Sequence, residues 1–172
     1  MTTLQKWQQF LASAPEAQRE YRTVELWHPQ FATVYRFVSD TYPVELTLEP
    51  DAPRNNGQLV TFAAATLTVR EPAERQDSSQ SLSVEFGNVD GTIHNIIDQI
   101  SGGGFFTPLQ VVYRKYYSAD LSRPAVPPLY LFAASVGFDG PTAVSFNAED
   151  SDLSQKRSGT IYTVEQYPGL RE

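Results

Sequence analysis

The spacing of the apolar residues changes inside the stretch 81–107. Apolar residues stand two apart in its first part, at Leu82, Val84 and Phe86, and three or four apart in its second part, at Ile93, Ile96, Ile97 and Ile100. A spacing of two places side chains on one face of a strand, whereas a spacing of three and four places them on one face of a helix. The pattern therefore predicts a strand that leads into one amphipathic helix.

Polar and glycine residues mark the two ends of this predicted helix. Asn88 or Asp90 can cap its start, because a short polar side chain accepts hydrogen bonds from the free N–H groups of the first turn. Residues 102–104 are three glycines, and glycine ends a helix where a positive φ is needed. We expect this helix to close one open end or face of a β-structure, because nearly all of the remaining chain reads as strand.

Alternation of apolar and polar residues predicts strands along most of the chain. The predicted strand segments are 23–29, 33–40, 44–49, 58–72 (as one long strand or two short ones), 81–86, 108–120, 129–140, 142–150 and 160–166. Asn56-Gly57 marks a tight turn, and Asp139-Gly140-Pro141 joins a hairpin. We expect a mainly β fold, a β-sandwich or barrel-like structure of about nine or ten strands, with an N-terminal helix and the central amphipathic helix.

The N-terminal segment has helical spacing but is short. Its apolar residues are Leu4, Trp7, Phe10 and Leu11, and Pro15 bounds its end. An isolated helix of this length is marginal because nucleation is costly, so these side chains must pack on something: the protein's own sheet, or a neighbouring subunit. The predicted organisation is a helical arm over residues 1–14 and a single β-rich domain over residues 15–172.

Composition and charge exclude several classes of protein. The chain has 172 residues, no cysteine, and 13 Lys and Arg against 20 Asp and Glu, which gives a net charge of −7. Disulfides and thiolate metal sites are therefore impossible, and the absence of clustered positive charge argues against nucleic-acid binding. No apolar run reaches membrane-spanning length and no signal-peptide pattern begins the chain, so we expect synthesis in the cytoplasm without export and no membrane partner.

The sequence offers little chemistry. The glycines at 102–104 are followed by Phe105 and Phe106 and not by the lysine and hydroxyl of a phosphate-binding loop. Glu149, Asp150 and Asp152 form the one tight acidic cluster, whose oxygens suit a hard cation, but EF-hand spacing is absent and binding stays an open question. No nucleophile motif is present, so we assign no catalytic residue, no metal and no cofactor.

The histidines and one basic pair read as structural residues. His28 ends a strand just before Pro29, where a hydrogen-bonded structural role is expected, and His94 is expected on the solvent side of the central helix. Arg114 and Lys115 stand among tyrosines and could stack a nucleic-acid base. One basic pair in an acidic chain is a weak signal for that role.

The order of several short motifs resembles a known family. They are Leu26-Trp27-His28-Pro29, the run 82–90 with Asn88-Val89-Asp90, a Val-x-x-Tyr strand leading to residues 118–122, and the closing Tyr162-x-x-Glu165-x-Tyr167-Pro168-Gly169-Leu170. Over most of the chain, from about residue 14 onward, this order resembles a family of tailed-phage proteins known as a domain of unknown function. Members resemble tail-tip components encoded near the tape-measure and hub proteins.

The resemblance implies a virion structural protein of the phage tail tip or baseplate. Such a subunit would form a ring around the DNA channel with copies of itself, with six-fold symmetry favoured and three-fold symmetry as the other candidate, beside tail-tube, hub and tape-measure proteins. The net negative charge suits a channel that must not hold DNA. Aromatic residues dominate interface energies, so the candidate subunit contacts, each of which could equally be core, are Trp7, Phe10, Leu11, Phe105, Phe106, Tyr116 and Tyr117.

A second function fits the same composition. A stand-alone binding module of β-sandwich or barrel form would recognise carbohydrate with surface tyrosine and tryptophan side chains. Such a module would be a monomer that binds glycans, whereas a ring subunit would associate with itself.

Overall fold

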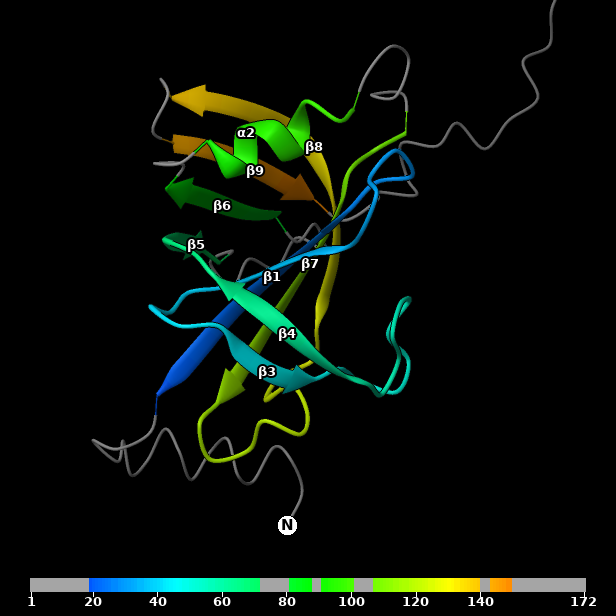
Figure 1. Cartoon of the computed structure of the whole chain (residues 1–172), viewed down its shortest axis with the longest axis vertical. Coiled ribbons are helices and arrows are strands. Elements are labelled where there is room, and N and C mark those ends of the chain that lie inside the picture. The colour runs from blue at the N-terminus through cyan, green and yellow to red at the C-terminus, as the bar shows by residue number, and fades with distance from the viewer. Residues whose placement is uncertain (1–18, 72–80, 88–90, 101–106, 140–142, 150–172) are drawn as a thin grey trace, which may run out of the picture.

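The computed structural model describes residues 19–71, 81–87, 91–100, 107–139 and 143–149 (Figure 1). The described residues are mainly β. Their strands are β1 (Glu20–Trp27), β2 (Tyr35–Val38), β3 (Val44–Thr47), β4 (Leu59–Ala64), β5 (Leu67–Arg70), β6 (Ser81–Gly87), β7 (Gln110–Tyr117), β8 (Leu129–Asp139) and β9 (Ala143–Glu149), and the helix is α2 (Thr92–Ile97). Each strand segment predicted within this part of the chain contains an observed strand. The N-terminal arm and the predicted strand 160–166 lie outside the described residues.

The nine strands form one sheet in the order β3-β4-β2-β1-β7-β8-β9-β6-β5. Neighbouring strands are antiparallel except β2 and β4, which are parallel. The hairpin of β8 and β9, predicted from the sequence, is confirmed by their antiparallel pairing from Asp139↔Ala143 to Phe132↔Glu149.

A short connection links the two sides of the strand order. β4 lies near one end of the strand order and β5 at the other, yet only Ala65 and Thr66 separate them along the chain. The N–H of Ala65 donates to the carbonyl oxygen of Val38 on β2 (3.0 Å), and the carbonyl oxygen of Thr66 accepts from the N–H of Gly87 on β6 (2.9 Å). Two residues can bridge the ends because the twist of the strands brings the ends together.

Two apolar clusters fill the fold. The larger cluster gathers side chains from β1, β2, β5, β6, β7, β8, β9 and α2, and includes the rings of Phe37, Phe86 and Phe146 in edge-to-face contact. The smaller cluster lies under β3 and β4 and consists of Val38, Leu46, Leu48, Ala52, Phe62 and Tyr116. Burial of this apolar surface is the main force that holds the curled sheet together.

Helix α2 is shorter than the predicted helix and begins differently. Its side chains Ile93, Ile96 and Ile97, with Ile100 beyond its end, are buried against the larger cluster, as the spacing predicts. Its N-cap residue is Gly91 at φ 73°, which has no side chain to cap the first turn. The predicted capping residues Asn88 and Asp90 lie outside the described residues, and the chain enters the helix through a left-handed conformation that glycine adopts without strain.

The segment 58–72 resolves into two short strands, as one of the two sequence alternatives proposed. The loop before it turns at Asn55 and Gly57, both with positive φ, and the N–H of Gln58 donates to the carbonyl oxygen of Asn55 (3.0 Å).

The described residues contain no helix long and apolar enough to cross a membrane.

Candidate functional site

A buried ion-pair cluster lies at the centre of the sheet. Arg114 on β7 is fully buried, and its Nε and Nη2 donate to the two carboxylate oxygens of Glu49, each at 2.8 Å. Its remaining nitrogen, Nη1, donates to Oε2 of Glu25 on β1 at 3.3 Å. The planar guanidinium thus binds one carboxylate in the bidentate geometry that arginine favours and reaches a second one.

Two further side chains complete the cluster. Nε of Arg36 on β2 donates to Oε2 of Glu25 (3.0 Å), and the hydroxyl of Tyr130 on β8 donates to Oε1 of Glu49 (2.6 Å). Burial acts to raise the pKa of Glu49, but hydrogen bonds from Arg114 and Tyr130 outweigh it and leave the pKa below its usual value. The same ion pairs raise the pKa of Arg114 against the opposing effect of burial. Both groups are therefore charged inside the protein.

The cluster is built for holding strands and not for chemistry. All three nitrogens of the Arg114 guanidinium are engaged by carboxylates, and Arg114 has no exposed surface. Lys115 next to it donates to Glu71 at 2.6 Å. Base stacking by Arg114 and Lys115, which the sequence analysis treated as a weak possibility, is disfavoured further, because Arg114 is enclosed in the fold and Lys115 is paired with a carboxylate.

Trp27 is covered by an arginine. The guanidinium carbon of Arg54 lies 3.6 Å from the centre of the Trp27 ring, and its Nη2 donates to Oε1 of Gln110 (2.8 Å). A stacked guanidinium is attracted to the ring face electrostatically. This ring face is thus already occupied, which weighs against its use as a platform for a sugar.

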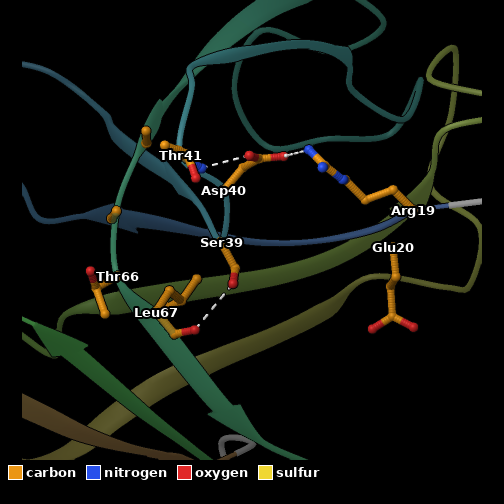
Figure 2. A pocket seen from close by; sticks show the side chains of 9 residues that line it. Arg19, Glu20, Ser39, Asp40, Thr41, Thr66 and Leu67 are labelled. Carbon is orange, nitrogen blue, oxygen red and sulfur yellow. Dashed lines mark hydrogen bonds and ion pairs between the residues drawn. The ribbon is translucent and has the colours of Figure 1, made fainter.

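An open cavity of about 730 Å³ marks the place where the ends of the sheet meet (Figure 2). Figure 2 shows Asp40 between Arg19 and the backbone of Thr41, and the hydroxyl of Ser39 directed at the carbonyl oxygen of Leu67. The N–H of Thr41 and the guanidinium of Arg19 lower the pKa of Asp40. The Ser39 bond connects the end of β2 to β5, and the Arg19–Asp40 ion pair connects the end of β2 to the start of β1, so these polar groups hold strands together.

The second half of β8 has lost its neighbour on the β7 side. The first half pairs with β7, from Tyr113↔Leu129 to Gln110↔Phe132, and the N–H of Ala133 donates to Leu109 (2.8 Å). An irregularity between Ala133 and Ser135 follows, and irregularities of this kind bend a strand and end its pairing. Among the described residues, no strand pairs with the β7 side of Ala134–Phe138, which we call the β8 margin. In Figure 1 it forms the free border of the upper part of the sheet.

The β8 margin is apolar and uncharged. Its sequence is Ala-Ser-Val-Gly-Phe, and the Phe138 side chain is 48% exposed. A groove of about 390 Å³ runs beside it, bounded by Ile97, Ile100 and residues 107–109. The ring of Phe138 lies 5.0 Å from that of His94 on α2. A strand border of this kind is a template for pairing with another strand.

The two end strands of the sheet are protected in contrast. On β3, the N–H of Thr47 donates to Leu121 (3.0 Å), and its carbonyl oxygen accepts from the hydroxyl of Tyr116 (2.9 Å). On β5, the carbonyl oxygen of Leu67 accepts from Ser39 (3.2 Å). Glu71, directly after β5, accepts from Tyr113 (3.0 Å) and Lys115. In the described part of the chain, backbone and side-chain partners thus cover Thr47 on β3 and Leu67 on β5, whereas no strand pairs with the β7 side of the β8 margin.

The predicted contact residues fall into two groups. Tyr116 is fully buried in the smaller apolar cluster and is therefore a core residue. Tyr117 at the end of β7 is half-buried. The other predicted contacts, Trp7, Phe10, Leu11, Phe105 and Phe106, lie outside the described residues. The sequence analysis missed the β8 margin, whose signal is the uncharged run from Leu129 to Phe138.

The histidines and the acidic cluster can also be placed. His28 is buried, its Nδ1 accepts from the N–H of Gln30 (3.2 Å), and its Nε2 lies 3.1 Å from the carbonyl oxygen of Thr107, which confirms the predicted structural role. The side chain of His94 is 52% exposed, as predicted. Glu149 is exposed at the end of β9, and Asp150 and Asp152 lie outside the described residues. Within the described part, no group of three or more potential ligand side chains is placed to hold a metal ion.

The described residues form a mainly β domain. Buried ion pairs connect its strands, and the β8 margin has no strand partner among these residues. Residues 7–162 match a family described as a domain of unknown function (DUF1833). The match spans most of the chain, so the protein belongs to this family. A comparison with curated proteins finds no match.

Proposed function

We propose that this protein is a structural subunit of a tailed-bacteriophage tail tip or baseplate, which joins copies of itself in a ring around the DNA channel. The motif order from Leu26 to Leu170 supports the phage assignment by resemblance. In this proposal the protein makes and breaks no bonds and requires no cofactor. Six-fold symmetry is favoured, with three-fold symmetry if the subunit belongs to the hub, and tail-tube, hub and tape-measure proteins are its neighbours in the virion.

The observation that carries the proposal is the β8 margin. Unpaired backbone groups beside an apolar groove gain hydrogen bonds and buried surface when another strand adds to them. Rings form through heterologous contacts, in which one face of a subunit meets a different face of the next. The unpaired border that the described residues leave along β8 suits such a contact, because it gives each copy a receiving surface.

The finer description of the fold belongs to the same proposal. We infer a barrel-like domain over residues 15–172, since two residues connect the opposite ends of the sheet. The arm over residues 1–14 is a short helix that packs on this domain or on a neighbour. The net charge of −7 opposes adhesion of DNA in the channel by simple repulsion.

Native mass spectrometry of the full chain over a range of concentrations tests the proposal. We expect closed oligomers of one stoichiometry that grow with concentration. Ala134→Lys places a charge on the margin, where lysine hinders strand addition, and should shift the population to monomer. Leu59→Lys is the matched control, because Leu59 is 62% exposed on β4, away from the margin. Oligomers that both variants leave unchanged would contradict the proposal, and a monomer that binds glycans would favour the carbohydrate-binding module.

A further inference from the structure

The β8 margin needs a strand of suitable length and composition. It offers five residues, Ala134–Phe138, and none of them carries a charge. A strand added there would continue the line of β7 beyond Leu109, where the pairing of β7 with β8 ends. Its alternate side chains would face the groove beside Ile97 and Ile100.

One segment of this chain has the sequence of such a strand and is not part of the described sheet. Residues 160–166 read Thr-Ile-Tyr-Thr-Val-Glu-Gln, a run rich in β-branched and aromatic side chains with no charge before Glu165. The other strand segments predicted from the sequence all contain strands of the sheet. In an extended strand, Tyr162 and Val164 fall on the same face and can fill an apolar groove.

The linker between β9 and this segment is long enough to reach another molecule. β9 ends at Glu149, which pairs with Phe132, two residues before the margin begins. Residues 150–159 then provide ten mostly polar residues, which span about 35 Å when extended. A segment that leaves the sheet beside β8 can therefore reach the margin of a copy placed alongside.

We propose that residues 160–166 of one copy add as a strand to the β8 margin of the next copy. This inference rests on the proposed function, because assembly through the margin requires that the strand come from a neighbour. Each copy gives one strand and receives one, so the contact is heterologous and closes into a ring when the rotation between copies permits it. Strand exchange between identical chains is a low-cost route to such assembly.

Photo-cross-linking tests the identity of the strand and its source. Phe138→p-benzoylphenylalanine keeps an aromatic side chain at the margin, and mixing light chains with ¹⁵N-labelled chains distinguishes links between copies from links within one. We expect cross-links from position 138 to residues 160–166 that join light and heavy chains. The same probe at Tyr42, which is 74% exposed outside the margin, should not capture this segment. Links to residues 160–166 only within one chain, or links between copies that reach any other segment, would overturn the inference.

A second variant leaves β8 unaltered. Thr163→Pro removes one N–H and disrupts the added strand, whereas Ser158→Pro places the same residue in the linker. Hydrogen exchange at Ala134–Phe138 should become faster in Thr163→Pro and stay unchanged in Ser158→Pro. Equal protection in both variants would overturn the inference.

The oligomeric state of the same samples separates this inference from the proposed function. Oligomers whose margin contacts a different segment would overturn the strand assignment and leave ring assembly standing. Monomers whose margin is covered by their own residues 160–166 would overturn both.

Discussion

Arg114 and Glu49 bind each other inside the protein through two hydrogen bonds of 2.8 Å, although they stand 65 residues apart in the sequence. Arg114 lies on β7, and Glu49 opens the loop that connects β3 to β4. The pair therefore fastens this loop, and the edge of the sheet that carries it, to the central strands. Tyr130 on β8 donates to the same carboxylate, so the loop is connected to both β7 and β8.

Removing the charge of Glu49 should destabilise the fold strongly. Glu49→Gln leaves the buried guanidinium of Arg114 with Glu25 as its carboxylate partner, and the same oxygen of Glu25 also binds Arg36. Breaking one partner of a buried ion pair costs about 3–5 kcal/mol, and we expect a loss of this size in the free energy of unfolding, measured by urea denaturation. Asp40→Asn is the control, because its partner Arg19 is 65% exposed, and should cause a much smaller loss.

The double variant Arg114→Met/Glu49→Leu measures the coupling between the two residues. We expect it to lose less stability than the sum of the single variants, because an apolar pair leaves no charge unpaired. Additive losses, or a loss below about 1 kcal/mol in Glu49→Gln, would show that the pair does not hold the loop.

Low pH should reduce the stability of the folded protein, because it protonates the carboxylate of Glu49. The pKa of Glu49 is lower in the folded protein than its ordinary value of 4.5, so its contribution to stability is complete above that value and is lost as the pH falls through the folded pKa. Glu71, whose pKa is lowered by Lys115 and Tyr113 against the effect of burial, contributes in the same direction. Urea denaturation at a series of pH values should show stability falling below about pH 4.5. A shallower fall in Glu49→Gln supports the assignment, and an identical fall contradicts it.

The hydroxyl of Tyr116 should contribute to the stability of the fold, although the side chain is buried and cannot contact a partner protein. It donates to the carbonyl oxygen of Thr47 at 2.9 Å and so protects the edge strand β3. Tyr116→Phe leaves that carbonyl without its donor, and we expect a loss of about 1–2 kcal/mol and faster hydrogen exchange in β3. Tyr42→Phe, at a side chain that is 74% exposed, should leave both measurements unchanged. Equal effects of the two substitutions would mean that Tyr116 does not protect the edge.

Local patterns predicted the strands but not the contacts between them. The alternation in residues 81–86 and 142–150 places Val84 and Phe146 in the core, and the structure pairs them directly. Such patterns depend on neighbours a few residues away, so the sequence contains them. The N-cap position of α2 was not predicted, because Gly91 occupies it through its backbone conformation and carries no polar side chain that a capping pattern could show.

The ion-pair cluster and the β8 margin depend on strand order, which no local pattern contains. Arg114 and Glu25 read as ordinary polar positions of half-exposed strands, but β1 and β7 are central strands whose two faces are both covered. A charge inside an otherwise apolar strand run, as in residues 110–117, was the available signal. The open border became visible only when β7 was found to pair with half of β8.

The most direct test of the assembly proposal is a density map of the intact phage particle that carries this protein. The account predicts a ring at the tail tip in which an additional strand, from residues 160–166 of the adjacent copy, lies against Ala134–Phe138 of each subunit. A ring in which this border faces solvent, or a particle without the protein, would contradict it.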